Sequence, residues 1–291
     1  MNIDASLVRR LVADQFPQWA DLPLEPVVSA GTDNAIYRLG ADLSVRLPRV
    51  ERAAGQVAKE VRWLPVLAPL LPLAVPVPRG KGVPAHGYPW SWSVHPWLDG
   101  DNATIERLAD PCEAARTLAR FVVALQGIDA ADGPRCGAPN EHRGVPLIRR
   151  DRLVRDAIGS LGDMIDARAA SEAWEAALQV PAWDGPPVWL HGDIHAGNLL
   201  ARQGRISAVV DFGLLGVGDP ACDLMVAWNL LGVEAREVFR AATGVDDAIW
   251  ARGRGWTLSV ALIALACYLH TNPALAAMSR RAIDAVLADG G

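Results

Sequence analysis

Lysine is nearly absent from this chain of 291 residues, and no run of basic residues occurs in it. Lys59 and Lys81 are the only lysines against 26 arginines, and acidic residues are in excess, with a net charge of −5. Proteins that bind nucleic acid carry clustered positive charge that neutralises phosphates. We therefore expect no nucleic-acid partner.

Long apolar runs and paired cysteines are missing as well. The first residues, MNIDASLVRRLVADQF, have no apolar segment after their charges, so we expect no secretory signal. The most apolar stretch, Ser259 to Leu269, is too short to span a bilayer and predicts a buried helix. The four cysteines are widely spaced and form no C-x-x-C pair, which is typical of free thiols. We therefore expect a cytoplasmic protein without a membrane partner.

The first hundred residues predict a small sheet with one main helix. Asp4 is placed to cap an amphipathic helix that ends near Gln15, and three strand-like runs follow: LEPVVSA, NAIYRLG and DLSVRLP. A second helix is predicted over Val50–Leu64, ended by Pro65, and a further strand in YPWSWSVHPW.

Beyond Gly100 the pattern becomes helical. Asp110 and Pro111 predict the start of a helix, and nearly everything after Pro220 has helical periodicity. We therefore expect an α+β fold with two parts, a β-rich lobe over residues 1–99 and a larger, mostly helical lobe over residues 100–291.

Two polar motifs interrupt the second part. HGDIHAGN places Asp193 and Asn198 five residues apart, and VVDFG places Asp211 thirteen residues later. Metal-assisted phosphoryl transfer needs a carboxylate that accepts the proton of the attacking hydroxyl. It also needs an amide oxygen and a second carboxylate for Mg²⁺. The order and residue types are those of the protein-kinase motifs H-R-D-L-x-x-x-N and D-F-G.

The first motif is also compatible with a zinc site or with a purely structural turn. His191 and His195, with Asp193 between them, could ligate Zn²⁺ in a hydrolase. The two glycines of the motif disfavour the helix that would bring both histidines to one face, and no third ligand is evident. Alternatively, the polar residues form only a hydrogen-bonded turn between strands, which leaves Asp211 unexplained.

A nucleotide site would also need phosphate-binding groups upstream. Gly31 and Thr32 lie between two predicted strands, where backbone N–H groups and the Thr32 hydroxyl could contact phosphate oxygens. A plain hairpin turn is the alternative. Arg46 lies on the strand LSVRLP, and Glu60, fourteen residues later on the next helix, is a suitable ion-pair partner. Exposed surface charges are the alternative for this pair.

Taken together, these segments resemble the aminoglycoside phosphotransferase and choline kinase superfamily, whose members have a bilobal protein-kinase-like fold and phosphorylate small molecules. The resemblance runs from GTDNAIYRL through VRLP, KEVRWLP and WSVHPWLDG to HGDIHAGNLL and VVDFGLLGVGDPACDL. It implies that Asp193 is the catalytic base, that Asn198 and Asp211 bind Mg²⁺, and that ATP or GTP is the phosphoryl donor.

The resemblance also implies the remaining nucleotide contacts. Arg46 takes the place of a phosphate-binding lysine, and arginine can fork onto two phosphate oxygens. The stretch WSVHPW is the expected interlobe hinge. Its expected backbone contacts to the adenine come from Ser93, Val94 and His95. Asp219 and Asp223 are expected to brace the catalytic loop.

The acceptor is left open, because fold and core chemistry do not fix a substrate. A small hydroxylated, amine-bearing molecule such as an aminoglycoside is our first expectation, with a macrolide, choline, homoserine or a sugar as alternatives. A catalytically silent nucleotide-binding protein is the competing hypothesis. A monomer or a homodimer is expected. Some acidic residues are candidates to meet amines, or else form solvated helix faces: Glu234, Glu237, Asp246 and Asp247.

Overall fold

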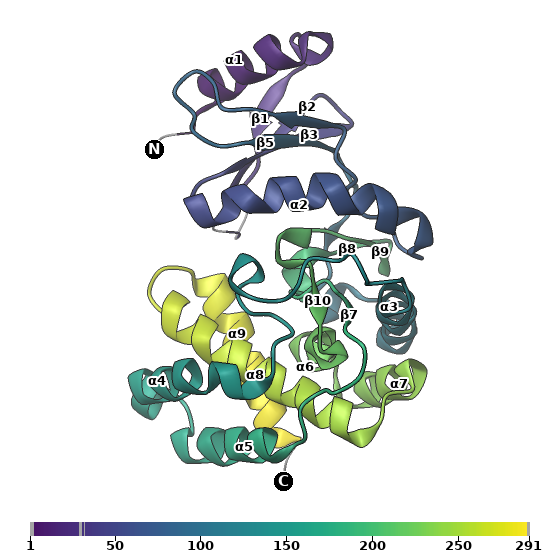
Figure 1. Cartoon of the computed structure of the whole chain (residues 1–291), viewed down its shortest axis with the longest axis vertical. Coiled ribbons are helices and arrows are strands. Elements are labelled where there is room, and N and C mark those ends of the chain that lie inside the picture. The colour runs from purple at the N-terminus through teal and green to yellow at the C-terminus, as the bar shows by residue number, and fades with distance from the viewer. Residues whose placement is uncertain (1–2, 29–30, 32, 290–291) are drawn as a thin grey trace.

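The computed structural model describes residues 3–28, 31 and 33–289, and these form two lobes (Figure 1). The smaller lobe, drawn in purple and blue, contains an antiparallel sheet and two helices. The larger lobe, in teal, green and yellow, is mostly helical. The predicted α+β architecture is confirmed.

The sheet of the smaller lobe has five strands, all paired antiparallel in the order β1-β2-β3-β5-β4. Residues that alternate along β2 and β3, such as Leu39, Val45 and Leu47, are buried, as expected for side chains on one face of a pleated strand. Figure 1 shows helices α1 and α2 on opposite sides of this sheet. The strands are β1 (Leu24–Pro26), β2 (Asn34–Leu39), β3 (Leu43–Pro48), β4 (Gly80–Gly82) and β5 (Trp92–Pro96).

Helix α1 (Ala5–Gln15) begins where the sequence predicts it. The Asp4 side chain accepts a hydrogen bond of 2.8 Å from the Leu7 backbone N–H, which satisfies one of the free donors of the first turn. The apolar face of the helix is buried against the sheet, and it includes Val8 and Leu11.

Helix α2 (Glu51–Leu67) is longer than predicted, because Pro65 does not end it. A proline inside a helix removes one N–H donor and clashes with the carbonyl four residues earlier, but α2 continues for only two residues beyond Pro65. The next bond is made, since the backbone N–H of Ala68 donates to the carbonyl of Leu64. Burial of Leu64 and Leu67 stabilises this extra turn.

The end of α2 belongs to the larger lobe. Each lobe has its own hydrophobic cluster, and Leu64, Leu67 and Val75 belong to that of the larger one. The chain after α2 also pairs with strand β9, where the backbone N–H of Val209 donates to the Ala74 carbonyl at 3.0 Å. Helix α2 therefore joins the sheet of the smaller lobe to the strand that precedes Asp211.

The helices of the larger lobe follow the predicted pattern. Helix α3 begins at Pro111, and the Asp110 side chain accepts hydrogen bonds from the backbone N–H groups of Cys112 and Glu113. The apolar stretch from Ser259 forms the second half of α8, which packs against α9. The helices are α3 (Pro111–Gln126), α4 (Asp151–Leu161), α5 (Ala167–Gln179), α6 (Val226–Asn229), α7 (Val233–Thr243), α8 (Asp247–Tyr268) and α9 (Pro273–Ala288).

Short strands of the larger lobe carry the two polar motifs. Strands β6, β8 and β9 form one small antiparallel sheet, and β7 pairs with β10. The first motif connects β7 to β8, and the second follows β9. The strands are β6 (Asp101–Asn102), β7 (Val188–Leu190), β8 (Leu199–Arg202), β9 (Arg205–Val209) and β10 (Gly216–Gly218).

Two sequence-based expectations concerned membrane-spanning helices and the state of the cysteines. Among the residues it describes, no helix combines the length and the hydrophobicity needed to cross a bilayer. The four cysteines are free thiols, as the spacing predicts.

Candidate active site

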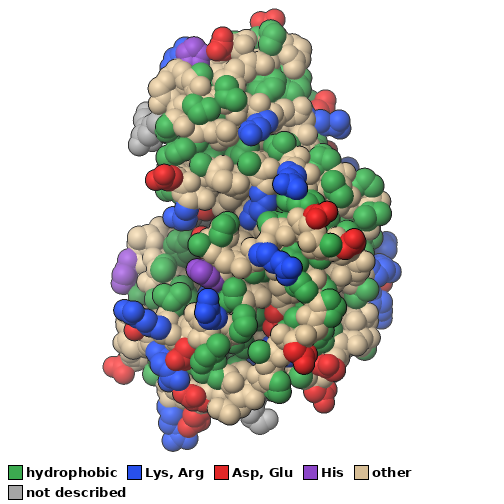
Figure 2. Space-filling view, viewed as in Figure 1, with side chains coloured by type: hydrophobic (Ala, Val, Ile, Leu, Met, Phe, Trp, Pro, Cys, Tyr) green, Lys and Arg blue, Asp and Glu red, His purple; other side chains and the backbone are tan. Residues whose placement is uncertain are grey.

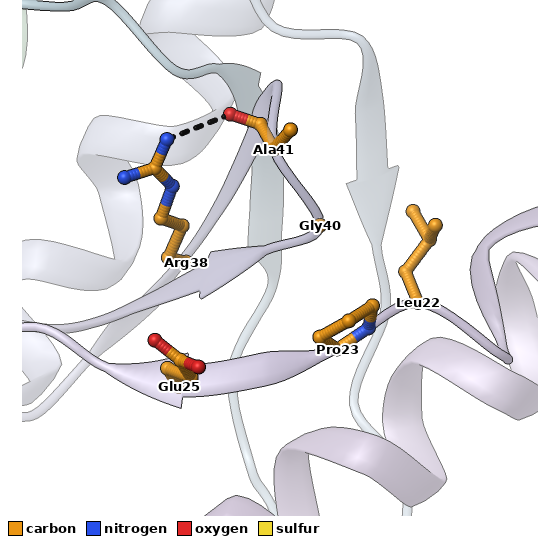
Figure 3. Close-up of a pocket in the computed structure, with 6 residues that line it drawn as sticks. All are labelled: Leu22, Pro23, Glu25, Arg38, Gly40 and Ala41. Atoms are coloured by element: carbon orange, nitrogen blue, oxygen red, sulfur yellow. Dashed lines mark hydrogen bonds between the residues drawn. The ribbon is translucent and has the colours of Figure 1, made fainter.

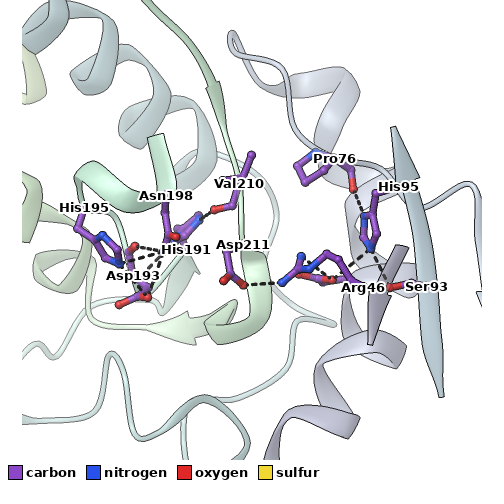
Figure 4. A network of polar contacts seen from close by, with 11 residues as sticks. Arg46, Pro76, Ser93, His95, His191, Asp193, His195, Asn198, Val210 and Asp211 are labelled. Atoms are coloured by element: carbon purple, nitrogen blue, oxygen red, sulfur yellow. Dashed lines mark hydrogen bonds and ion pairs between the residues drawn. The ribbon is translucent and has the colours of Figure 1, made fainter. Parts of the chain in front are cut away.

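The two motifs and Arg46 meet at the boundary between the lobes. Figure 2 shows that the surface is hollowed on one side between the lobes, with Lys or Arg side chains along this notch. In Figure 4, Asp193 and Asn198 of the larger lobe lie on one side of Asp211, and Arg46 of the smaller lobe lies on the other. The residues predicted as catalytic and metal-binding are therefore brought to one place by separate elements.

The loop of the first motif, residues 191–198, is fixed by its backbone geometry. Gly192 has a φ of +81°, a left-handed conformation that L side chains rarely adopt. A Cβ atom at this position would lie 2.7 Å from the Leu214 carbonyl oxygen. The loop can therefore make its sharp turn after β7 only with glycine here, and this turn exposes Asp193 to the lobe boundary.

The Asp193 carboxylate has polar partners on both oxygens. Asn198 Nδ2 donates to Oδ2 at 3.1 Å and to the Asp193 carbonyl at 3.0 Å. His195 Nε2 lies 3.4 Å from Oδ2, and Arg143 Nη2 lies 3.5 Å from Oδ1. Burial raises the pKa of Asp193, but His195, Arg143 and His191 outweigh burial and hold this pKa below its usual range. Asp193 is therefore ionised at neutral pH, as a proton acceptor must be.

His191 has a structural role in the motif. The Asp193 backbone N–H donates to His191 Nδ1 at 3.2 Å, so His191 Nε2 carries the proton that it donates to the Val210 carbonyl at 3.1 Å. The His191 ring also packs against Phe212, with ring centroids 4.5 Å apart. Both ring nitrogens are thus engaged, which argues against zinc ligation by His191. Over the described part of the chain, no three His, Cys, Asp or Glu side chains are grouped to hold a metal.

Asp223 braces the loop of the first motif through hydrogen bonds to its backbone, as predicted. This buried carboxylate accepts hydrogen bonds from the backbone N–H groups of His191 at 2.7 Å and Gly192 at 2.8 Å. Burial raises its pKa to about 7, although the two backbone donors favour the ionised form. Asp219 acts elsewhere: it binds Arg252 at 2.9 Å and caps the turn after β10.

Asp211 adopts an unusual backbone conformation. Its φ of +64° and ψ of +70° lie in the left-handed region, which is uncommon for a residue other than glycine and recurs at functional sites. The side chain points towards the smaller lobe, and its Oδ1 lies 2.9 Å from Arg46 Nη2 (Figure 4). Gly213 packs tightly against α2. A Cβ atom at this position would lie 2.6 Å from Gln56 Oε1.

Arg46 and Glu60 form the predicted ion pair. Arg46 Nη1 on β3 donates to Glu60 Oε1 on α2 at 3.2 Å, and both side chains are largely buried. Burial lowers the pKa of Arg46, but Glu60 and Asp211 outweigh this effect and raise it. Arg46 therefore bridges the two lobes as a permanent cation between two carboxylates, which rules out an exposed surface pair.

The donor set at Asn198 and Asp211 fits Mg²⁺. Asn198 uses its amide nitrogen for Asp193, and no hydrogen bond to its Oδ1 is found within the described residues. Arg46 contacts only Oδ1 of Asp211, so Oδ2 of this carboxylate remains available to a metal ion. Amide and carboxylate oxygens are the hard ligands that Mg²⁺ prefers.

The predicted hinge position does not fit the sheet. Strand β5 lies between β3 and β4, so the backbone of Ser93 and Val94 is paired on both sides. The Val94 carbonyl accepts a hydrogen bond from the Arg79 N–H at 2.7 Å. The side chain of His95 is likewise engaged, with Ser93 Oγ and the Pro76 carbonyl each at 2.8 Å. These residues hold the sheet together, and the connection between the lobes follows them.

Burial also sets the charge of His95. It lowers the pKa of this imidazole to about 3, and the nearby Arg46 acts in the same direction. His95 is therefore neutral at physiological pH, and the Glu60 carboxylate 3.9 Å away is balanced by Arg46 and not by His95.

The predicted phosphate-covering loop is only partly described. Gly31 is exposed and lies just before β2. Thr32 lies outside the described residues, so its predicted contact with phosphate stays a prediction.

Two further polar residues of the site were not predicted from the sequence. Arg143 approaches Asp193 from the loop before α4, and nothing in the surrounding DGPRCGAPNEHRGVP marks it out. Lys59 lies beside Glu60, donates to the Pro139 carbonyl at 3.4 Å, and has a pKa lowered to about 8 by burial. The rarity of lysine in this sequence was the only available signal.

A separate hollow in the smaller lobe shares no residue with this site (Figure 3). Arg38 and Glu25 supply its polar side chains, and Arg38 donates to the Ala41 carbonyl at 3.0 Å. It has no group suited to phosphoryl transfer. Its lining residues are Leu22, Pro23, Glu25, Arg38, Gly40 and Ala41.

Relatives in sequence include phosphotransferases. An aminoglycoside 3'-phosphotransferase of Salmonella typhimurium is 27% identical over 119 residues, which are 40% of this chain and 42% of the relative. The uncharacterized protein YcbJ of Bacillus subtilis (strain 168) is 25% identical over 190 residues, or 62% and 57% of the two chains. The alignments thus span about half the length of these relatives.

Solved structures share the fold over nearly the whole chain. The GDP and kanamycin complex of APH(2")-IIia superposes with a TM-score of 0.76 and 18% identity, covering 98% of this chain and 99% of that chain. Macrolide 2'-phosphotransferase MphH from Brachybacterium faecium gives a TM-score of 0.62 and 25% identity, with 97% of each chain covered.

The family match agrees with the geometry. Residues 26–256 match the phosphotransferase enzyme family, and this span contains Arg46, Glu60 and both polar motifs. The chain therefore belongs to the phosphotransferase enzyme family.

Proposed function

We propose that this chain is a Mg²⁺-dependent phosphotransferase that moves the γ-phosphoryl group of ATP or GTP to a hydroxyl of a small molecule. The observation that carries the proposal is the meeting of Asp193, Asn198, Asp211 and Arg46 at the lobe boundary. Residues 1–99 supply most nucleotide contacts, and residues 100–291 supply the base and the acceptor site.

Arg46 is the proposed phosphate-binding group. Its guanidinium is held by Glu60 at 3.2 Å and remains charged at any physiological pH. Its approach to Asp211 places the phosphate-binding cation beside the proposed metal ligand. The GDP named in solved structures with this fold supports a nucleotide as a ligand of this chain.

We assign the contact to the nucleotide base to the residues that follow β5, and not to the middle of this strand, where the sequence predicted it. Trp97 still pairs with the sheet, because its backbone N–H donates to the Asp42 carbonyl at 2.7 Å. Leu98, Asp99 and Gly100 follow in an irregular connection between the lobes. Their backbone groups are the proposed partners of the adenine or guanine edge.

Asn198 and Asp211 are the proposed Mg²⁺ ligands. A bound Mg²⁺ supplies positive charge against the β- and γ-phosphates and aligns them for transfer. The left-handed backbone of Asp211 directs its carboxylate towards the smaller lobe, where the phosphates are expected.

Asp193 is the proposed general base. Its carboxylate accepts the proton of the acceptor hydroxyl as that oxygen bonds to the γ-phosphorus and the bond to the nucleoside diphosphate breaks. Asn198 and His195 fix the orientation of the carboxylate through Oδ2, so the incoming hydroxyl is expected at Oδ1, from which Arg143 Nη2 lies 3.5 Å away. We place this reaction in the cytoplasm, where the nucleoside triphosphates are available.

The decisive experiment is a consumption assay with Mg-ATP and Mg-GTP across a panel of acceptors, with the phosphorylated product identified by mass. Kanamycin and a macrolide belong in the panel because of the relatives' names. Choline, homoserine and neutral sugars complete it. Asp193→Asn is the matched control, since it keeps the shape of the side chain but removes the base.

Two outcomes would oppose the proposal. Near-normal turnover by Asp193→Asn would show that this carboxylate is not the base. Tight Mg-nucleotide binding without transfer to any acceptor, together with no γ-phosphate release, would favour the silent nucleotide-binding protein.

A further inference from the structure

Arg143 is a buried arginine with too few partners. Its side chain is 9% exposed, and its Nη2 lies 3.5 Å from Asp193 Oδ1. Within the described residues its side chain makes no hydrogen bond, and its Nε is buried without an acceptor. A guanidinium has five N–H donors, and buried donors that lack a partner cost free energy. This pattern indicates a group that is missing from the chain itself.

A second buried arginine lies next to it. Arg150 Nε donates to Ser259 Oγ at 2.6 Å, and its guanidinium stacks over the Trp256 ring at 5.1 Å. No carboxylate of the described residues pairs with it, and burial together with the charge of Arg143 lowers its pKa to about 10. Trp256 Nε1 is the other buried side-chain donor of the described chain without a partner. Positive charge and unused donors are thus concentrated in one region of the larger lobe.

Arg143 lies at the Asp193 oxygen that Asn198, a proposed metal ligand, does not contact. Asn198 and His195 contact Oδ2, whereas Arg143 lies at Oδ1. Arg143 comes from the helical lobe, as does Arg150, which packs on α8. A ligand of Arg143 is therefore expected to come from the acceptor and not from the nucleotide.

The loop holds Arg143 in place. The two residues before it, Glu141 and His142, both have left-handed backbones, with φ of +53° and +58°. Asn140 Nδ2 donates to the Arg143 carbonyl at 3.0 Å, and the Arg143 N–H donates to the Asn140 carbonyl at 3.1 Å. A site built on such a fixed backbone is preorganised for a ligand.

Of the four acidic residues considered for an amine-bearing acceptor, Glu234 and Glu237 are exposed on α7, and the other two have partners of their own. Asp246 caps α8 by accepting from the Ile249 N–H at 2.7 Å, and Asp247 pairs with Arg240. A polycationic acceptor at Oδ1 would compete with Arg143 for the Asp193 carboxylate and bring a second positive charge close to this guanidinium. Like charges at close range oppose binding.

We propose that Arg143 binds a carboxylate of the acceptor, so that the substrate class is a hydroxy acid or sugar acid and not a polyamine. This proposal rests on the proposed function, since it takes Asp193 as the base. A hydroxyl bound to Asp193 and a carboxylate bound to Arg143 would lie about 4 to 6 Å apart, given ordinary hydrogen-bond lengths of about 2.8 Å. The acid group is therefore only two or three bonds from the carbon that bears the reacting hydroxyl.

The first test uses the free protein and no nucleotide. The ¹⁵N resonance of Arg143 Nε–H, assigned by its loss in Arg143→Lys, is followed while acetate replaces chloride at constant ionic strength. We expect a saturable shift of this resonance, no such shift with ethylammonium chloride, and an unchanged response in Arg149→Gln. Arg149 is an exposed residue of the same loop and serves as the matched control. No saturable shift with acetate overturns the proposal.

The second test compares acceptors that differ only in the acid group. Gluconate and glucose, glycerate and glycerol, and kanamycin are assayed with Mg-ATP and Mg-GTP. We expect the acid of each pair to be preferred, and Arg143→Gln to lower kcat/KM for the acids by roughly tenfold to a hundredfold, the value of a charged hydrogen bond. Activity on the neutral partners should fall as well, because Arg143 contacts Asp193, but by a smaller factor, so that the preference of wild type for the acid of each pair is lost.

The outcomes separate this inference from the proposed function. Equal losses for acids and neutral acceptors in Arg143→Gln would mean that Arg143 acts on Asp193 or on the transferred phosphoryl group, which overturns the inference. A preference of wild type for kanamycin also overturns it and leaves the phosphotransferase standing. Failure of wild type to bind Mg-nucleotide opposes the proposed function alone, because the acetate titration needs no nucleotide.

Discussion

The ion pair between Arg46 and Glu60 gives the sharpest quantitative prediction. Arg46→Ala leaves the Glu60 carboxylate, 3% exposed, without its cation. An unpaired buried charge costs about 3 to 5 kcal/mol. Asp211 also loses a partner, but its side chain is 43% exposed, so solvent screens that loss.

Protonation of Glu60 limits this cost and makes it depend on pH. Burial already raises the pKa of Glu60 in the folded protein, and Arg46 opposes this effect. Without Arg46 the pKa rises further, so the folded variant retains a proton that the unfolded chain releases above about pH 4.3. Stability therefore falls as the pH rises through this window. Protonating an ordinary carboxyl costs about 1 kcal/mol at about pH 5 and about 4 kcal/mol at about pH 7.5.

We therefore expect Arg46→Ala to lose about 3 to 4 kcal/mol of unfolding free energy at about pH 7.5, and only about 1 kcal/mol at about pH 5. Urea unfolding followed by tryptophan fluorescence measures both values. His95, whose pKa is about 3, stays neutral in wild type over this range.

The double variant Arg46→Ala/Glu60→Gln is the control. It should recover most of the stability at the higher pH, since no carboxylate is left unpaired. An equal loss at both pH values, or a double variant no more stable than Arg46→Ala, would refute the reasoning. Arg46→Lys should keep part of the Mg-ATP affinity that Arg46→Ala loses.

Three further predictions concern the catalytic loop and the metal ligands. Asp211→Ala should weaken Mg²⁺-dependent nucleotide binding more than Asn198→Ala, because only Asp211 carries charge; calorimetry with Mg-ATP measures this, and undiminished binding and turnover in both variants would contradict the metal role. Asp223→Asn replaces an acceptor oxygen by an NH₂ group facing a backbone N–H, so turnover should fall by at least about tenfold with Mg-ADP affinity retained; unchanged turnover would contradict the bracing role. Gly192→Ala should cost about 1 to 3 kcal/mol of stability, measured by urea unfolding, and a neutral effect would contradict the steric argument.

The residues of the two motifs could be predicted because their chemistry is local. Asp193, Asn198 and Asp211 are identified by residue type and spacing within short segments. The caps at Asp4 and Asp110 were likewise predictable, since a side chain and the N–H groups it satisfies are two or three residues apart. The alternation of the apolar residues Leu43, Val45 and Leu47 similarly predicted that Arg46 lies on the other face of this strand.

The hinge could not be placed from the sequence, because the residues of β4 have none of the sequence features that predict a strand. Its three residues, Gly80–Gly82, have neither apolar alternation nor β-branched side chains. They nevertheless pair with β5 and occupy its second edge, which leaves Ser93 and Val94 without free backbone groups. A strand that exists only through pairing with its neighbour is decided by the tertiary structure.

The sequence by itself indicated phosphoryl transfer, because the order and spacing of Asp193, Asn198 and Asp211 are a property of the chain. Only the tertiary structure decided what surrounds the base. Arg143 lies fifty residues before Asp193 in a loop without a motif, and the two meet because this loop pairs with Val217 and Asp219, at β10, the strand beside β7. Contacts between distant segments depend on packing, and so the charge presented to the acceptor is a property of the fold and not of any segment.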